Sequence, residues 1–277
     1  MIAAAQHFVP SPDGVFVATL RRSSLIIHST KSDHPLHAWS LPIDCVSQCK
    51  CIRWSRALHT TDTNLQRAQD IETQFGAYRV LLAGDDTIRI YDVADPTWHG
   101  SVDGAACGMG KVANVGFGCS SNEILVFSDF GVKVTIWSLV TKRGIEIRDP
   151  KYAVQCYDYR PRTGHLALLT RSMAQETLLI LKPGSHEVVR NVELASIDAQ
   201  EVKWSMDGHW LAVRDTASAG PKVYVYTSDG HLFRTYTGSQ DLGDVALGVK
   251  CLHWTPAGLL LIGGYEGIVT ILNKNIV

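Results

Sequence analysis

The chain has 277 residues, 45% of them hydrophobic, and a formal net charge of −1. This length and composition are ordinary for a globular protein of one or two domains, and the small charge gives no reason to expect nucleic acid or an anionic membrane as a partner. No apolar run of about 18 residues predicts a membrane-spanning helix. The seven cysteines are odd in number and fit a reducing intracellular compartment.

A short unit recurs six times: an aromatic residue, a tight turn and a central apolar strand. In the stretch EVKWSMDGHWLAV, Asp207 and Gly208 predict a hairpin turn, because glycine adopts positive φ without steric cost. The other copies are HFVPSPDGVFVATL, CIRW with VLLAG, VGFG with EILVFS, YDYRP with HLALLT, and LHWTPAG with LLLIGG. The predicted anchor aromatics are Phe8, Trp54, Phe117, Tyr159, Trp204 and Trp254.

Two further strands are predicted in each copy. The third strands are expected at 24–29, 87–93, 133–139, 177–183, 222–227 and 268–274. A more polar fourth strand, such as LHAWSLP or WHGSVDG, follows in the first five copies. Most anchors lie 42 to 50 positions apart by subtraction of their numbers, close to the period of about 40–45 residues of WD40 blades. The sequence therefore predicts an all-β fold, a WD40-type β-propeller with six recognisable blades.

The blade boundaries define one propeller domain over 1–277. The blades are expected at about 4–46, 47–104, 111–150, 153–195, 199–240 and 247–277. The sixth copy lacks a fourth strand before Val277, and only Met1 to Ala3 precede the first inner strand. We therefore expect a ring that is incomplete or poorly closed, in a fragment of a longer protein or a truncated gene model.

An insertion at 56–78 interrupts the second blade. Within it Leu65, Ala68, Ile71 and Phe75 recur at helical spacing, which predicts a short amphipathic helix that binds a partner or folds back onto the propeller. A variable loop without regular structure is the alternative interpretation.

Two small groups of side chains are candidates for partner binding. Trp98 and His99 begin the outer strand of the second blade, where an aromatic side chain can anchor a partner or pack between neighbouring outer strands. Arg148 and Lys151, and separately Arg160, belong to charged clusters at blade edges. These clusters would contact an acidic peptide at the rim or be ordinary solvated turns.

Metal binding and catalysis have little support in the sequence. Cys45, Cys49 and Cys51 lack the second cysteine pair of a structural zinc site, so buried thiols in a strand are the favoured interpretation. No GxSxG, HExxH, P-loop or GxGxxG motif occurs, and the inner strands carry few metal ligands. We expect no cofactor, no metal and no enzymatic activity, with a propeller enzyme as the alternative class.

Four stretches resemble one family of WD-repeat proteins. They are IRIYDVADPTWHGSVDG (88–104), VKVTIWSLVTKRGIEIRDPK (132–151), PKVYVYTSDGHLFRTYTG (221–238) and GVKCLHWTPAGLLLIGGYEGIVTILNK (248–274). They are similar, in order, to the WD-repeat protein eight family of spindle-pole and centrosomal proteins. The Gly-His dipeptide that usually precedes each WD blade is missing.

The resemblance implies a non-enzymatic scaffold of the cytoplasm and cytoskeleton, at the centrosome or spindle pole body. Family members bind a coiled-coil spindle-pole anchoring protein and, in fungi, a minus-end kinesin-14 motor, and they act in microtubule anchoring and spindle organisation. No nucleic-acid or membrane partner is implied. The alternative is a generic WD40 adaptor in another intracellular complex, such as a ubiquitin ligase, a trafficking coat or an RNA-processing assembly.

Overall fold

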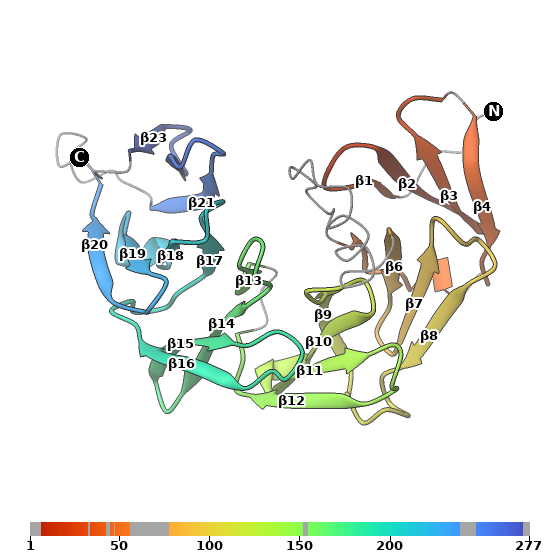
Figure 1. The fold of residues 1–277 in the computed structure, drawn as a ribbon, viewed down its shortest axis with the longest axis horizontal. Helices are drawn as coiled ribbons and strands as arrows, with labels where there is room; N and C mark the ends of the chain where they lie inside the picture. Colours follow the sequence, from red (N-terminus) through yellow and green to blue (C-terminus); the bar gives the residue numbers. More distant parts are fainter. Residues whose placement is uncertain are drawn as a thin grey trace. The chain divides into compact units, whose positions relative to one another are not determined.

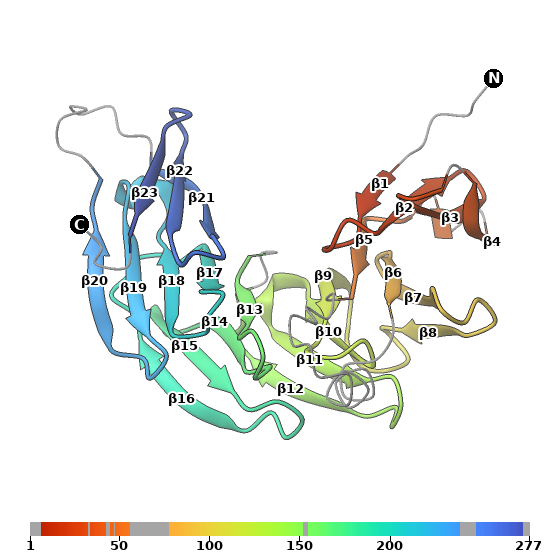
Figure 2. The same ribbon diagram turned by 45° about the horizontal axis from the view of Figure 1, so that its top comes forward.

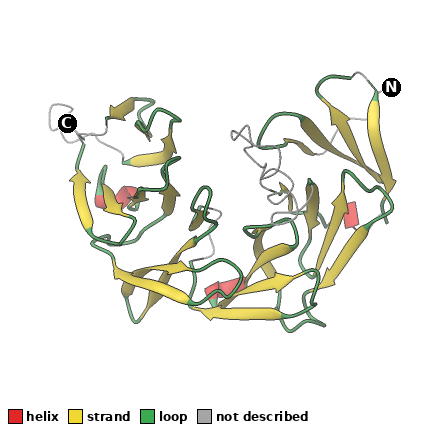
Figure 3. Cartoon of the chain, viewed as in Figure 1, coloured by secondary structure: helices red, strands yellow, loops and turns green. Residues whose placement is uncertain are grey.

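The computed structural model describes residues 7–32, 34–42, 45–46, 48–55, 78–151, 155–238 and 248–273. Contacts divide the chain into two compact units, Met1–Ile147 and Arg148–Val277. Both units consist of antiparallel sheets whose strands follow one another in sequence (Figures 1 and 2). Strands and turns make up nearly all of the described chain (Figure 3). None of the helical segments found there is long and apolar enough to cross a membrane.

The first unit contains three four-stranded sheets. Their strands are β1 (His7–Pro10), β2 (Phe16–Arg21), β3 (Ser24–Ser29) and β4 (Pro35–Ser40); β5 (Cys51–Trp54), β6 (Arg79–Ala83), β7 (Thr87–Asp92) and β8 (His99–Asp103); and β9 (Val112–Phe117), β10 (Glu123–Ser128), β11 (Lys133–Ser138) and β12 (Gly144–Arg148). A short 3-10 turn, η1 (Asp129–Gly131), joins β10 to β11. Each sheet is one blade of the predicted kind.

The second unit contains the remaining three sheets. Their strands are β13 (Tyr157–Tyr159), β14 (Leu166–Ser172), β15 (Gln175–Leu181) and β16 (Val188–Glu193); β17 (Glu201–Trp204), β18 (Trp210–Arg214), β19 (Val223–Thr227) and β20 (Leu232–Tyr236); and β21 (Val249–Trp254), β22 (Leu260–Gly264) and β23 (Val269–Leu272). A second 3-10 turn, η2 (Ala217–Ala219), precedes β19. The sixth sheet has three strands in the part of the chain that the structure describes, as its sequence predicts.

The predicted hairpin turn is confirmed and occurs in closely similar form in two blades. The Ser205 hydroxyl donates to Asp207 Oδ1 at 2.6 Å and accepts the Trp210 N–H at 3.0 Å. Ser11 makes the equivalent bonds to Asp13 and from Phe16, at 2.6 and 2.9 Å. A glycine with positive φ closes each turn, Gly208 at 72° and Gly14 at 71°. The side chains thus satisfy the turn's backbone donors locally.

Five of the six predicted anchor aromatics are buried, but the prediction for Phe8 is wrong. Phe8 is 68% exposed. Trp204 lies directly before the serine of its turn, and in the first blade Pro10 holds that place, opposite Val17 in the sheet. The prediction chose the nearest aromatic, two positions too early, because proline replaces an aromatic residue at the anchor position.

The cores lie between consecutive blades of each unit. In the first unit, Leu20, Ile27, Ile52 and Trp54 belong to one cluster formed by the first two blades. The Trp54 indole donates to the Val9 carbonyl at 2.9 Å, and in the second unit the Trp254 indole donates to the Lys203 carbonyl at 3.2 Å. Each of these rings therefore buries its apolar surface and also bonds the inner strand of the preceding blade. A fully buried aliphatic side chain contributes about 1.5–3 kcal/mol to stability.

The insertion leaves and re-enters the second blade at one closed turn. The Ser55 N–H donates to the Arg79 carbonyl at 2.8 Å, and the Ser55 hydroxyl accepts the Arg79 N–H at 2.9 Å. The blade therefore keeps its hairpin geometry despite the added residues. The helix predicted around Leu65, Ala68, Ile71 and Phe75 lies outside the described residues.

Candidate functional site

Trp98 is part of the packing in the second blade, whereas His99 beside it is exposed. The half-buried Trp98 ring packs against the core cluster of the second and third blades. The Arg79 guanidinium carbon lies 3.8 Å from the centre of this ring, a distance at which the ring's negative face attracts the cation. The two side chains are therefore neighbours in sequence with different environments.

Arg79 joins the second and third blades. Its Nε donates to Asp92 Oδ2 at 3.0 Å, and one terminal nitrogen donates to Asn122 Oδ1 at 2.5 Å and to the Ser121 carbonyl at 3.1 Å. The other carboxylate oxygen of Asp92 accepts the Ala94 N–H at 2.9 Å. The planar guanidinium presents its donors to these acceptors in a fixed geometry, which the flexible point charge of a lysine does not.

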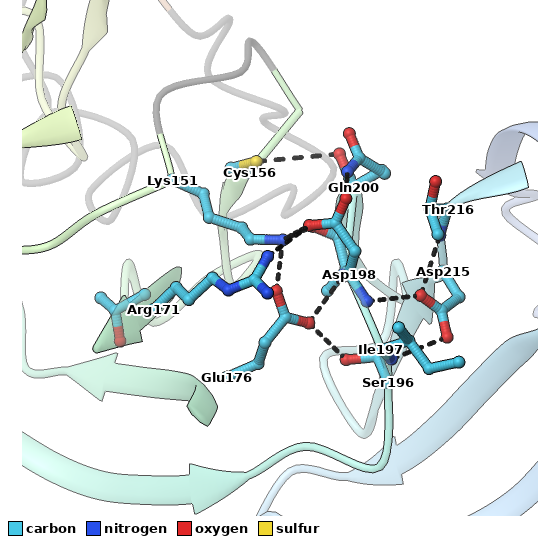
Figure 4. Close-up of polar contacts among 12 residues, drawn as sticks. Lys151, Cys156, Arg171, Glu176, Ser196, Ile197, Asp198, Gln200, Asp215 and Thr216 are labelled. Atoms are coloured by element: carbon cyan, nitrogen blue, oxygen red, sulfur yellow. Dashed lines mark hydrogen bonds and ion pairs between the residues drawn. The ribbon is translucent and has the colours of Figure 1, made fainter. Parts of the chain in front are cut away.

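Lys151 lies in a largely buried network of the second unit, shown in Figure 4. Only 13% of its side chain is exposed, and Nζ forms ion pairs with Glu176 and with Asp198, the latter at 2.5 Å. The same nitrogen donates to the Ala199 carbonyl at 2.6 Å. These contacts take up the donors of Lys151, so its role in the structure is to hold the linker between the fourth and fifth blades.

Two buried carboxylates bind the backbone of that linker. Glu176 Oε2 accepts the Ala199 N–H at 2.6 Å and the Ser196 hydroxyl at 2.8 Å. Asp215 is fully buried and accepts the N–H groups of Ile197 at 3.0 Å and Asp198 at 2.8 Å. We call residues 194–200 with Glu176, Asp215 and Lys151 the linker clasp. Hydrogen bonds to ionised groups are about twice as strong as neutral ones, so the clasp fixes the linker.

The electrostatics of the clasp favour the ionised form of Asp198. Partial burial disfavours the charge on Asp198, but hydrogen bonding and charge from Lys151 outweigh it and hold the pKa of that carboxyl below its usual value. Burial raises the pKa of Tyr224, and the charge of Asp215 raises it further. The Tyr224 hydroxyl thus remains a proton donor toward Asp215, at 3.4 Å.

A third buried cation, Arg214, connects the fifth blade to its neighbours. Its Nε donates to Glu201 Oε2 at 3.1 Å, and a terminal nitrogen donates to the Val249 carbonyl of the sixth blade at 3.1 Å. The other terminal nitrogen reaches Gln155 Oε1 at 3.4 Å. Burial raises the pKa of Glu201 and the ion pair with Arg214 opposes that rise. This pair is a structural contact that links the fifth blade to the sixth.

The remaining candidates, Arg148 and Arg160, lie apart from the clasp contacts. Arg148 is exposed at the end of β12. Arg160 is half-buried, with its guanidinium carbon 5.2 Å from the centre of the Trp204 ring. Of the five predicted residues, Trp98 and Lys151 are thus engaged internally, and His99, Arg148 and Arg160 belong to different turns and strands.

The cysteine prediction is correct only in part. Cys51 lies in β5, but Cys45 and Cys49 precede the strand, and all three are half-buried free thiols. Burial raises the pKa of the Cys49 thiol to about 11, and the neighbouring thiols add to this rise. Such a thiol is a poor nucleophile at neutral pH. No group of three or more metal-ligating side chains occurs among the described residues.

Several large apolar side chains are exposed on turns and linkers, and the sequence reasoning missed them. Phe130 in η1 is 93% exposed and Met173 in the β14–β15 turn is 101% exposed. Both have positive φ, 62° and 49°. Ile197 is 62% exposed although its backbone is held in the linker clasp. In the sequence, bulky apolar residues inside turn segments could have indicated these exposed side chains. Likewise, the charged residues Glu176 and Arg214 within otherwise apolar strands could have indicated the buried ion pairs.

Two curated relatives are WD-repeat proteins, whereas no family model matches the chain. WD repeat-containing protein WRAP73 of Mus musculus is 26% identical over 264 residues, which cover 95% of this chain and 51% of the relative. An uncharacterized WD repeat-containing protein of Schizosaccharomyces pombe is 25% identical over 187 residues, 66% of this chain and 37% of that protein. The chain spans about half the length of the mouse relative.

Solved β-propellers share the fold. The Dos1 propeller superposes with a TM-score of 0.64 at 12% identity, covering 98% of this chain and 68% of that one. Hsv2 of Kluyveromyces lactis gives 0.57 at 15% identity, with coverages of 96% and 73%. The Cps50 (Swd1) β-propeller domain gives 0.58 at 11%, with coverages of 99% and 84%. At these identities the likeness concerns the fold alone, and it confirms the predicted WD40-type β-propeller.

Proposed function

We propose, from the premise that this chain is a WD-repeat protein with a β-propeller fold, that it is a non-enzymatic scaffold of the centrosome or spindle pole body. In this role it binds protein partners for microtubule anchoring and for organisation of the mitotic spindle. The observation that carries the proposal is the similarity to a WD-repeat protein over 95% of the chain. Beside it stand the stretches 88–104 and 132–151, which resemble the spindle-pole family.

The distribution of charged groups supports a binding role over a catalytic one. Arg79, Lys151 and Arg214 are engaged with carboxylates and carbonyls that hold neighbouring blades and linkers together. The exposed side chains of the turns, by contrast, project from a rigid scaffold of sheets, the arrangement that binding loops commonly have. Pairs of aromatic and cationic residues at such turns are suited to anchor a protein partner.

The proposed partners are a coiled-coil spindle-pole anchoring protein and, in fungi, a kinesin-14 motor. Their binding residues would be at least partly accessible, and the exposed His99 and Arg148 and the half-buried Arg160 remain the candidates on this chain. Trp98 and Lys151 would act mainly by keeping the neighbouring surface in place.

Affinity purification of the tagged full-length protein from mitotic cells tests the proposal. We expect a coiled-coil spindle-pole protein in stoichiometric amount, reproduced with the two purified proteins, and a tagged protein concentrated at spindle poles. Recovery of ubiquitin-ligase, trafficking or RNA-processing components, with a diffuse or vesicular signal, would instead support the generic WD40 adaptor. Turnover of a substrate by the purified protein would contradict the scaffold.

A further inference from the structure

The fourth blade contains the same six-residue turn twice, at one end of its sheet. The turns are Arg160–His165, between β13 and β14, and Lys182–Glu187, between β15 and β16. Because Leu166 pairs with Leu181 across β14 and β15, the two turns emerge side by side. Each begins with a cation followed by proline, as the sequences RPRTGH and KPGSHE show.

The backbone hydrogen bonds of the two turns match one for one. The first N–H donates to the sixth carbonyl, from Arg160 to His165 at 2.8 Å and from Lys182 to Glu187 at 2.9 Å. The fifth N–H returns to the first carbonyl, from Gly164 at 3.0 Å and from His186 at 2.9 Å. The two cations at the first positions therefore occupy equivalent places on neighbouring turns.

Arg162 has a left-handed backbone conformation, and glycine occupies the equivalent position of the second turn. The third position has φ of 66° at Arg162 and 79° at Gly184. A side chain with a Cβ is disfavoured in this left-handed region, and Gly184 shows that the turn forms without one. Backbone strain of this kind occurs at functional sites. At the fifth position the two turns are reversed, with Gly164 at 71° and His186 at 55°.

Three cations gather on these turns against one carboxylate. Arg162 and Lys182 are exposed, and in the described part of the chain no ion pair joins them or Arg160 to a carboxylate. The single acid of the two turns, Glu187, accepts the Ser185 hydroxyl at 3.4 Å. Burial lowers the pKa of His165, and the positive charges of Arg160 and Lys182 lower it further.

Arg160 is held in position by the fifth blade. Its guanidinium lies over the Trp204 ring, and a Cβ at Gly208 would come within 3.0 Å of its Nε. The nearby acid of the fifth blade, Asp207, accepts bonds from Ser205 and His209 within its own turn, at 2.6 and 3.1 Å. A fixed guanidinium loses little conformational entropy when it binds a carboxylate or phosphate.

We infer that the paired turns of the fourth blade, Arg160–His165 and Lys182–Glu187, form a binding site for an anionic peptide segment of a partner protein. Arg160 is the positioned cation, and Arg162 and Lys182 are the exposed ones that meet the carboxylate or phosphate groups. Recognition of acidic or phosphorylated motifs by clustered cations is an established mode of peptide binding. The inference rests on the proposed scaffold function and names the chemistry of one partner.

Fluorescence anisotropy with the full chain tests this site. The probes are a labelled peptide of Glu, Ser and Gly, its counterpart with phosphoserine in place of Glu, and a Gln version. We expect saturable binding of the Glu peptide or the phosphoserine peptide and no binding of the Gln peptide. Comparison of the two anionic peptides shows whether carboxylate or phosphate is preferred. The double variant Arg162→Gln with Lys182→Gln should weaken binding at least ten-fold. The control Arg190→Gln with Lys250→Gln removes the same charge from exposed positions on β16 and β21 and should change it less than two-fold.

Other outcomes overturn the inference. Failure of both anionic peptides to bind, an equal effect of the control variant, or binding only to phosphatidylserine vesicles or duplex DNA would each contradict a peptide site. If the two double variants unfold at the same temperature, misfolding is excluded as the cause of weakened peptide binding. If the wild-type chain recovers its coiled-coil partner while the peptides do not bind, the scaffold function stands and this site falls.

Discussion

The carboxylate of Glu176 accepts the backbone N–H of Ala199 at 2.6 Å, although the two residues are 23 positions apart. Glu176 lies in β15 and is 3% exposed, and its other oxygen faces Lys151. This side chain thus connects strand β15 of the fourth blade to Ala199 in the linker that follows the blade and to Lys151 in the segment that precedes it. The packing of the blade on this linker therefore depends on a carboxylate that is almost completely buried.

Replacement of this carboxylate should be costly. Glu176→Gln keeps the shape of the side chain but leaves a buried amide group against Lys151, the Ala199 N–H and the Ser196 hydroxyl. We therefore expect a loss of about 2–4 kcal/mol of unfolding free energy. Denaturant unfolding measures it. Glu187→Gln, at an exposed position, is the control and should change stability by less than about 0.5 kcal/mol. Equal stability of the two variants would show that the linker clasp is not a stabilising unit.

Substitutions of Trp98 and His99 should have different effects on the unfolding free energy measured in the same assay. Trp98→Ala removes a half-buried ring from the core and from the Arg79 guanidinium, and we expect it to lower the unfolding free energy by about 2 kcal/mol. His99→Ala should leave stability within about 0.5 kcal/mol. A stable Trp98→Ala protein would indicate that this ring is available to a partner.

The Tyr78 hydroxyl should make stability fall at high pH. Burial and the hydrogen bond to Asp13 raise the pKa of Tyr78 to about 12, above the value of about 10 in an unfolded chain. The folded state therefore favours the neutral phenol, and this stabilisation is complete below pH ~10 and is lost as pH rises toward 12. Denaturant midpoints between pH 8 and 11.5 measure the loss, which Tyr78→Phe should reduce. Parallel curves for the two proteins would refute the link.

Asp13, the hydrogen-bond partner of Tyr78, should make stability fall at low pH. Partial burial disfavours its charge, but hydrogen bonds from Ser11 and Tyr78 outweigh burial and lower the pKa of Asp13. Its stabilisation is present above the unfolded pKa of about 3.9 and is lost as pH falls below it. Asp13→Asn should therefore be less stable than wild type at pH 7 and should approach it at pH 3. A constant difference between the two proteins would contradict this account.

Arg162→Gly should improve stability while it impairs binding. Gly184 in the matching turn shows that glycine fits this conformation, so relief of the left-handed strain should offset the added flexibility of the unfolded chain and yield about 0.5–1 kcal/mol. Thermal unfolding and peptide anisotropy on the same preparation measure both effects. If Arg162→Gly is less stable than wild type and still binds the peptide fully, the left-handed conformation of Arg162 is not retained for peptide binding.

The sequence predicts most of the blade architecture because its signals are local. Asp207 with Gly208 defines a turn within a few residues, and the third strand of the first blade has the bounds predicted for it, Ser24–Ser29. Phe8 was misplaced because the anchor position of that blade carries proline, which breaks the aromatic pattern. Local signals thus fail wherever one blade departs from the residue type of the others.

Charged residues were harder to place because their partners lie far along the chain. Lys151 looks like part of a solvated cluster with Arg148, yet it meets Asp198, 47 positions later. No periodicity links two such residues, since the contact exists only once the fourth and fifth blades have packed. The paired turns are likewise visible as RPRTGH and KPGSHE, but their adjacency follows from the β14–β15 register.

The linker clasp also bears on how the fourth and fifth blades come apart. Opening the fifth blade would pull Asp215 from the N–H groups of Ile197 and Asp198 and would leave the charges of the fourth blade facing a loosened linker. Separate melting of either module is therefore penalised, and the two should exchange their amide hydrogens as one cooperative unit. A repeat protein ordinarily frays module by module; here the shared carboxylates make the pair the smallest element that can open.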